Sequence, residues 1–378
     1  MSRSAMRLAQ TRSAVLGGPA PRLPRCYAGT VQGLLGLVLL PACGIPDSDP
    51  PPPGPFLDDW TEVTRIGEYE TPVEEVFGSI RAAALLARGG VVILDGQGAR
   101  AVGFDDDGAH AFTFGRRGPG PEEFEDPSAL FRIADDTLAF LNRSARTLQL
   151  FAREATGPFR ETGRHQLPFW PSGGCSMHSR IFILGSHEDL AVHEVNRAGK
   201  VLHSFPASDY ADEAASDAPE SIAWDLRDQA RSGYLLCAEE SGHVIHVPYY
   251  LGWARAYTAS GSLAWHSALP DFVKRMVVPA AGGGAVKYEF DPGFNFSHRV
   301  LGAAVVPDTH LALSISVTVP RGQEPPVEGL LALLDLTTGS QTRRDEFGGI
   351  VMSGLGRRVA VAYRDPFPTL AILAREES

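Results

Sequence analysis

VVILDGQGARAVGF (residues 91–104) and LAFLNRSARTLQLF (residues 138–151) are two copies of one pattern. Each copy starts with an apolar run that ends on Asp95 or Asn142, passes through polar residues, and closes on Phe104 or Phe151. Matching positions are 47 residues apart (142 − 95 and 151 − 104). A fixed period of this length is typical of the four-stranded unit that repeats around a β-propeller.

The segment between the copies reads GRRGPGPEEFEDP (residues 115–127). Its Gly and Pro residues are suited to a tight crossing from one sheet to the next. We therefore expect a blade-to-blade connector, with the Phe124 ring packed between the sheets. A phosphate cradle at Gly115–Gly118 is disfavoured, because Glu122 and Glu123 follow and no Gly-Lys-Ser/Thr sequence closes the loop.

Short apolar runs bounded by Gly, Asp and Pro recur along the chain, and no long stretch has helical periodicity. They predict five complete blades and a sixth that is one strand short: residues 79–114, 128–164, 175–205, 233–267, 298–347 and 350–374. Asp105–Gly108 is expected to be a hairpin turn. Residues 210–219 are expected to form an excursion at the rim that could hold one helical turn.

The strand missing from the last blade can come from the beginning of the domain. Residues 60–67, WTEVTRIG, alternate like a strand and belong to no other blade. If they pair as the outer strand of the last blade, burying Val63 and Ile66, the ring closes and no sheet edge is left exposed. The fold class is therefore all-β, a six-bladed β-propeller; the alternative is seven blades, with one more hidden in residues 206–231.

The amino-terminal region has the features of an export signal. Residues 1–42 contain five arginines, no lysine and no acidic residue, and Val31–Leu40 is an apolar run. That run is shorter than the ~20 residues that a membrane-spanning helix needs. Leu40-Pro41-Ala42-Cys43 resembles a bacterial lipobox, which implies that Cys43 becomes the lipidated first residue of the mature protein; the alternative is an unmodified cysteine after an ordinary signal.

The residues that follow Cys43 support an anchored protein. Residues 43–55 are rich in proline and polar residues, and such a segment forms an extended tether rather than a core. We predict a lipoprotein signal peptide at 1–42, a tether at 43–55 and the propeller at 56–378. The protein is expected to be exported and lipid-anchored in the cell envelope, at the outer membrane or the periplasmic face.

Charge limits the choice of partners. The formal net charge is −11, and removal of the leader with its five arginines changes it to −16, since 29 basic residues (34 − 5) then face 45 acidic ones. An acidic protein of this kind is not expected to bind nucleic acid or anionic lipid surfaces.

Two of the four cysteines, Cys175 and Cys237, remain in the mature domain apart from Cys43. Both are expected in the innermost strands of neighbouring blades. In an exported protein they can form a disulfide, but buried free thiols are equally compatible with those positions. No Cys-x-x-Cys spacing supports a zinc or thiol-redox site.

Residues 76–151 carry a family resemblance. They have a Phe-Gly pair at 77–78, a strand that ends in Asp95, an Arg-containing turn into a strand that ends in Phe104, and a Gly-rich connector that closes on Glu-Phe and Pro. This pattern resembles the NHL-type six-bladed β-propeller lipoproteins of bacteria, although Glu122 stands where the pattern usually has Gly. The resemblance covers residues 60–165 and implies a fold and an envelope location, without a reaction.

The sequence offers no catalytic residue and no metal ligand set. It has no Gly-x-Ser-x-Gly motif. His243 and His246 are three positions apart on one predicted strand, which directs them to opposite faces. Asp105–Asp107 lack the spacing of a calcium loop. No cofactor is predicted.

Recognition residues are the remaining candidates. In a propeller, the loops between second and third strands share one face with the blade connectors. Aromatic and Arg side chains are enriched in recognition surfaces, so we predict a ligand face at this end: Arg116, Arg117, Arg143, Tyr249 and Tyr250. The alternative is that these are ordinary rim residues.

Two functions remain open. The first is a non-catalytic envelope lipoprotein whose propeller binds a peptide, a glycan or a partner envelope protein. The second is a lactonase-like, metal-dependent hydrolase with a metal held on the axis by Glu, Asn and Asp. Asp126 and Glu220 are expected near the inner ends of first strands, but no matching Asn is found there, which favours binding.

Overall fold

The computed structural model describes residues 60–67, 76–154, 157–206, 219–281, 285–306, 310–325, 327–364 and 367–375. All of them belong to one compact unit, Pro52–Ser378. The predicted leader, Cys43, the tether and most of the predicted excursion at 210–219 lie outside the described residues. No helix in the described part of the chain combines the length and apolar character that crossing a membrane requires.

The described residues form six four-stranded antiparallel sheets. Within each of the first three sheets the strands pair in chain order: β2 (Ile80–Leu85), β3 (Val91–Asp95), β4 (Arg100–Phe104), β5 (His110–Phe114); β6 (Pro127–Ala134), β7 (Thr137–Asn142), β8 (Thr147–Ala152), β9 (Arg160–Gln166); and β10 (Pro171–Met177), β11 (Arg180–His187), β12 (Leu190–Val195), β13 (Val201–Phe205).

The fourth and fifth sheets repeat this order: β14 (Tyr234–Ala238), β15 (His243–Val247), β16 (Trp253–Thr258), β17 (Leu263–Ala268); and β20 (Ser297–Val306), β21 (His310–Thr318), β22 (Gly329–Asp335), β23 (Gln341–Glu346). The sixth consists of β24 (Ile350–Leu355), β25 (Arg358–Tyr363), β26 (Thr369–Arg375) and β1 (Trp60–Ile66). The first strands contact one another in a closed circle, β2 to β6, β10, β14, β20, β24 and back to β2. The fold is a six-bladed β-propeller.

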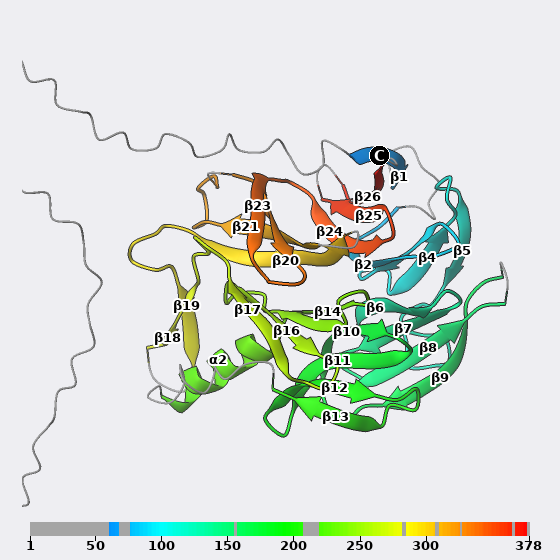
Figure 1. Cartoon of the computed structure of the whole chain (residues 1–378), viewed down its shortest axis with the longest axis horizontal. Helices are drawn as coiled ribbons and strands as arrows, with labels where there is room; N and C mark the ends of the chain where they lie inside the picture. The colour runs from blue at the N-terminus through cyan, green and yellow to red at the C-terminus, as the bar shows by residue number, and fades with distance from the viewer. Residues whose placement is uncertain are drawn as a thin grey trace, which may run out of the picture. The chain divides into compact units, whose positions relative to one another are not determined.

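The amino-terminal strand closes the ring as predicted. β1 pairs antiparallel with β26, from Trp60 opposite Arg375 to Ile66 opposite Leu370, and Figure 1 shows the blue strand β1 beside the red strand β26. The prediction that Val63 is buried was wrong, since its side chain is 55% exposed. The register shifts between Glu62 and Thr64, so Val63 is left out of the ladder and Thr64 takes the buried position.

The repeat found in the sequence has a clear structural role. Asp95 and Asn142 occupy the same register, opposite the first residues of β2 and β6. The buried Asp95 carboxylate accepts hydrogen bonds from the backbone N–H groups of Gln97 and Gly98, at 3.2 and 3.1 Å, and thereby fixes the turn into β4. Asp105 orders the next turn by accepting from the N–H groups of Asp107 and Ala109. The hairpin turn predicted there is confirmed.

Phe124 fills the space between the first two blades, as expected. Its side chain is fully buried and stacks on Phe140 with ring centroids 4.8 Å apart, while Phe114 and Phe151 pack around the pair. Offset aromatic pairs of this kind contribute about 0.5–1.5 kcal/mol beyond the burial of their area. Phe124 therefore anchors the Gly/Pro connector in the hydrophobic core.

Two connectors hold elements that the sequence did not predict. Residues Glu220–Arg231 form the helix α2, and Met276–Pro279 and Val286–Glu289 form the hairpin β18–β19. α2 packs against β18, β19 and β11 (Figure 1). Residues 220–231 are therefore helical and supply no seventh blade, and Glu220 begins the helix instead of lying at a first strand.

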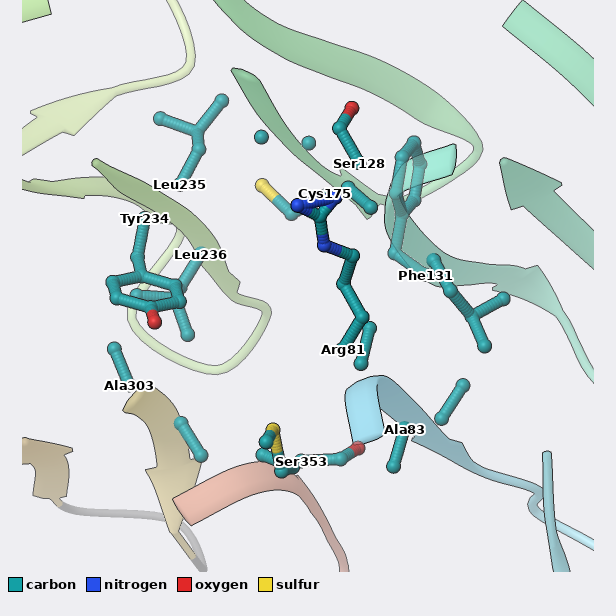
Figure 2. Close-up of a pocket in the computed structure, with 18 of the residues that line it drawn as sticks. Arg81, Ala83, Ser128, Phe131, Cys175, Tyr234, Leu235, Leu236, Ala303 and Ser353 are labelled. Carbon is teal, nitrogen blue, oxygen red and sulfur yellow. The ribbon is translucent and has the colours of Figure 1, made fainter. Parts of the chain in front are cut away.

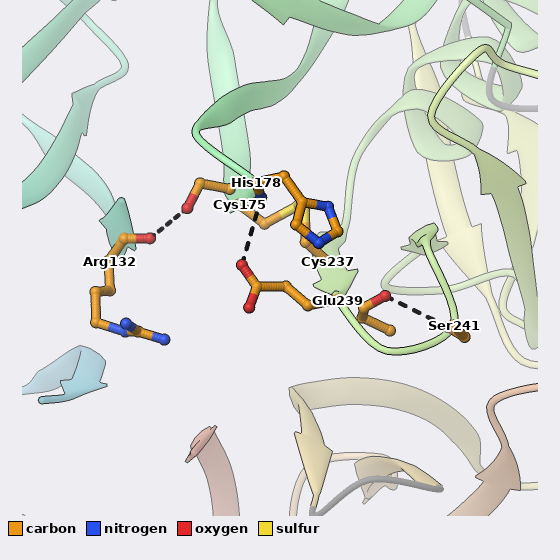
Figure 3. The surroundings of a disulfide bond; sticks show 8 residues. Arg132, Cys175, His178, Cys237, Glu239 and Ser241 are labelled. Carbon is orange, nitrogen blue, oxygen red and sulfur yellow. Dashed lines mark hydrogen bonds between the residues drawn. A yellow bond between two sulfur atoms is a disulfide. The ribbon is translucent and has the colours of Figure 1, made fainter. Parts of the chain in front are cut away.

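The cysteines left open by the sequence form a disulfide. Cys175 on β10 and Cys237 on β14 are bonded, with Cα atoms 5.5 Å apart and a sequence separation of 62 (Figure 3). Beside the bond, the Ser176 hydroxyl donates to the Arg132 carbonyl and the His178 N–H donates to Glu239. A loop of this size is worth ~4 kcal/mol in the chain-entropy model. The disulfide ties the inner strands of blades three and four together.

Candidate functional site

The candidate site is a cavity of ≈ 600 Å³ on the propeller axis. All six first strands contribute to its wall: β2, β6, β10, β14, β20 and β24. Because the first strand of each blade lies innermost, side chains that are far apart in sequence meet here. This volume is within the range of small-ligand sites in proteins.

Arginine dominates the charge of this cavity. Five arginines line it, while Asp126 is the one carboxylate among the described lining residues: Arg81, Arg132, Arg143, Arg299 and Arg364. The chain as a whole has a net charge of −11. Positive charge is therefore concentrated at one concave place in an acidic protein, which is where it attracts anions most effectively.

Two of these arginines are available to a ligand. Within the described part of the chain, no carboxylate lies within 4 Å of the Arg143 or Arg299 guanidinium, and both side chains are exposed. Arg81 makes a loose ion pair with Asp126 at 3.7 Å and donates to the Pro127 carbonyl at 3.4 Å. Figure 2 shows the Arg81 side chain extending into the cavity. Arg132 pairs with Asp135 at 3.0 Å.

Tyrosines form the wall beside Arg299. The Tyr234 and Tyr249 rings meet edge to face, with centroids 5.2 Å apart, and Tyr249 lies 6.3 Å from Tyr250. The Arg299 guanidinium lies over both Tyr249 and Tyr250, at 5.7 and 5.3 Å from the ring centroids. This stack fixes the direction of a long, flexible cation.

The pKa values of Tyr234 and Tyr249 determine whether these tyrosines carry charge beside the arginines. Burial raises the pKa of Tyr249, and the charges of Arg299, Arg143 and Arg81 act in the opposite direction. Burial likewise raises the pKa of Tyr234, whose hydroxyl donates to the Leu301 carbonyl. Both phenols are therefore neutral near pH 7 and leave the arginine charges uncompensated.

The structure separates the predicted ligand-face residues into two groups. Arg143 and Tyr249 line the axial cavity, and Tyr250 lies directly behind Tyr249. Arg116 and Arg117 lie on the first connector, outside the cavity lining. There Arg116 binds the Glu123 carboxylate, and Arg117 donates to the Gln97 carbonyl at 3.3 Å.

Several residues of the site were missed in the sequence. Arg81, Arg299 and Arg364 come from blades one, five and six, and Tyr234 comes from blade four. The available signal was an arginine near the start of a first strand, where a propeller directs side chains to the axis. Arg81 and Arg299 share that placement, as the second and third residues of β2 and β20.

A second hollow lies beside the axial cavity and shares Arg143, Ser172 and Ser232 with it. Its cavity volume is ≈ 690 Å³, and α2 forms one wall. Trp170 and Trp224 both line it and are 59% and 64% exposed. We call it the α2 groove.

The residues of the axial cavity do not suit a divalent cation. Such a cation prefers several oxygen ligands or imidazoles, whereas here one carboxylate is outnumbered by five guanidinium groups. Nowhere in the described ranges do three or more His, Cys, Asp or Glu side chains gather in a way that could hold a metal ion. His243 and His246 do not act together: the former contacts the Leu336 carbonyl, and the latter is buried and contacts the Ser232 carbonyl.

Comparisons with known proteins identify the fold and give no family. No protein-family model matches the chain, and no curated protein matches it. Among solved structures, a protein of Bacteroides fragilis inferred to be exported is similar with a TM-score of 0.53 and 11% identity, over 84% of this chain and 96% of that one. A DUF4221-family member from Bacteroides vulgatus has a TM-score of 0.54 and 9% identity, over 84% and 98%.

Virginiamycin B lyase from Staphylococcus aureus is a weaker match, with a TM-score of 0.45 and 10% identity over 83% of this chain and 99% of the lyase. At these identities the likeness concerns the fold alone. The chain is similar to six-bladed propeller proteins over most of its length.

Proposed function

We propose that this protein is a lipid-anchored envelope protein whose propeller binds an anionic ligand in the axial cavity without transforming it. The observation that carries the proposal is the lining of this cavity, which has five arginines and one carboxylate; Arg81 pairs loosely with that carboxylate, and Arg132, near the end of β6, pairs with Asp135. Guanidinium groups bind carboxylates and phosphates through paired, charge-assisted hydrogen bonds. With Arg143 and Arg299 near no carboxylate of the described chain, a ligand carrying two or more acidic groups can bridge them.

The envelope location rests on separate observations. The leader, the lipobox-like Leu40-Pro41-Ala42-Cys43 and the proline-rich tether support export and anchoring. The Cys175–Cys237 disulfide fits an oxidising compartment. Changing Cys43→Ser should move the protein from the membrane fraction to the soluble envelope fraction; an unchanged membrane fraction would contradict the anchor.

A lactonase-like hydrolase is the other candidate that the sequence left open. Its metal would be held on the axis by carboxylate and amide side chains, and five guanidinium groups would oppose that metal there. The donor set therefore supports anion binding over this alternative.

Binding can be tested with two polyanions of different chemistry, hexa-L-glutamate and hexagalacturonate, titrated by calorimetry into the full chain purified in detergent. For whichever polyanion the wild type binds, we expect the double variant Arg143→Ala/Arg299→Ala to have an affinity about 100-fold lower, because two charge-assisted contacts are lost.

The matched control is Arg160→Ala/Arg197→Ala, which removes the same charge from exposed positions outside the cavity. It should change the affinity less than threefold. Equal losses in the two variants would show a non-specific charge effect and would overturn the proposal, as would failure of the wild type to bind either polyanion.

A further inference from the structure

The α2 groove differs chemically from the axial cavity that it adjoins. Trp170, in the connector that leads into β10, lies at the groove together with Trp224 of α2. The remaining lining residue without a polar side chain is Gly185, among the residues that the structure describes. The two indole rings are therefore the large apolar side chains of the groove, and apart from Gly185 the other lining residues are polar or charged.

Trp170 is restrained although it is exposed, and Trp224 is presented by a helix. The Arg146 guanidinium lies 5.0 Å from the centre of the Trp170 ring, so one face of this indole is covered and its orientation is restrained. Trp224 belongs to a helix whose opposite side is buried through Ala223, Ala230 and Gln229. Large aromatic side chains left at a solvent-facing hollow are typical of recognition sites.

The charges of the groove are biased toward cations. Arg231 pairs with Asp189 at 3.3 Å, which neutralises both. Burial raises the pKa of the Asp228 carboxyl, whereas the Arg143 charge next to it acts to lower that pKa. Three arginines and two aspartates therefore line the groove, Arg227 also lies 3.9 Å from the exposed Glu220 carboxylate, and the groove continues into the arginine-lined cavity.

The side chains that line the α2 groove limit the classes of ligand that it can bind. A peptide held by side-chain anchoring would need aliphatic pockets; among the described residues the strands β10 and β11, the loops and α2 present polar groups and two indoles to the groove instead. A sugar ring has a flat C–H face that stacks on an indole. Its hydroxyls can donate to the oxygens of Ser172 and Ser232, whose own O–H groups donate to backbone carbonyls, and can accept from Ser186, whose oxygen accepts from Arg231. A carboxylate on the ring complements Arg143 and Arg227.

We propose that the α2 groove binds an acidic saccharide, with ring faces on Trp170 and Trp224 and carboxylates on Arg143 and Arg227. Because the groove shares Arg143 with the axial cavity, this inference rests in part on the proposed function. A linear chain of uronate residues can then extend from the groove into the axial cavity.

The test compares hexagalacturonate with maltohexaose, a neutral hexasaccharide, and with hexa-L-glutamate. Trp170→Ala and Trp224→Ala should each weaken hexagalacturonate binding by about tenfold and leave hexa-L-glutamate binding unchanged. Maltohexaose should bind more weakly than hexagalacturonate to the wild type. The control Leu202→Ala truncates an equally exposed apolar side chain, 57% exposed on β13, and should have no effect.

The outcomes separate the two proposals. If the tryptophan variants bind hexagalacturonate like the wild type while Arg143→Ala/Arg299→Ala weakens it, the saccharide groove is wrong and the axial site stands. If hexa-L-glutamate loses as much affinity as hexagalacturonate in the tryptophan variants, the groove recognises acidic peptides and the inference is overturned. Both tryptophans are exposed, so unchanged melting temperatures would confirm that the variants are folded.

Discussion

Arg143 and Arg299 are the residues on which the functional account depends. Arg143 follows β7 of blade two, and Arg299 lies on β20 of blade five. The neutral tyrosines next to Arg299 orient its guanidinium without cancelling its charge. In the proposed function, a ligand anion supplies the charge compensation that the described chain does not.

Three buried histidines lead to a second prediction at the scale of single residues, which concerns how stability depends on pH. Burial lowers the pKa of His193, His246 and His298 to about 4 from the ordinary value of 6.5. These side chains are neutral in the folded protein and take up protons more readily when the chain unfolds. The stability they contribute is complete above pH 6.5 and is lost as the pH falls toward 4, by up to ~3 kcal/mol for each histidine.

Urea unfolding at pH 7.5 and pH 4.5 tests this. The free energy of unfolding should fall less for His246→Gln than for the wild type between the two pH values, because one buried imidazole no longer has to be protonated. His110→Gln, at an exposed position, serves as the control. Equal acid sensitivity of His246→Gln and wild type would show that His246 is not buried in its neutral form.

At the scale of elements, β1 decides whether the ring is closed. It pairs with β26 along its length and buries Trp60, Thr64 and Ile66. Its removal would expose the edge of β26, and exposed strand edges promote aggregation. Each lost ladder hydrogen bond costs ~1 kcal/mol net, against a typical stability of about 5–15 kcal/mol.

Deletion of residues 56–68 is therefore expected to abolish cooperative thermal unfolding or to cause aggregation. Deletion of residues 45–54, within the predicted tether, should leave the melting temperature within a degree or so of the parent. Calorimetry on both variants checks this. If the two deletions melt like the parent, the ring is closed elsewhere and the pairing of β1 with β26 does not hold the fold together.

Some secondary-structure elements could be predicted from the sequence and others could not. The strands and the closure could be predicted because turn residues and apolar runs repeat with the blades. Helix α2 could not, because its buried side consists of small and polar residues, including Asp225 and Gln229, while its large apolar side chain Trp224 is exposed. Asp225 is compensated by Gln229 and by the Tyr288 hydroxyl of β19, a partner 63 residues away.

At the scale of the whole molecule, the axial site is a product of the closed ring. Its arginines extend from Arg81 to Arg364 in the sequence; three lie on the first strands β2, β6 and β20, and two follow the second strands β7 and β25, so the ring of blades brings both kinds to the axis. The sequence could identify Arg143 and Tyr249 by the face on which their loops lie. It could not rank them above Arg116 and Arg117, because distance from the axis depends on the packing of all six blades.

The most direct measurement of the central claim is an arginine footprint on the intact protein. Phenylglyoxal modification would be followed residue by residue by mass spectrometry, with and without saturating hexagalacturonate or hexa-L-glutamate. The account predicts that either polyanion protects Arg143 and Arg299, while Arg160 and Arg197 react at unchanged rates. Protection confined to Arg160 or Arg197, or no difference at Arg143 and Arg299 at saturation, would contradict an anion site on the propeller axis.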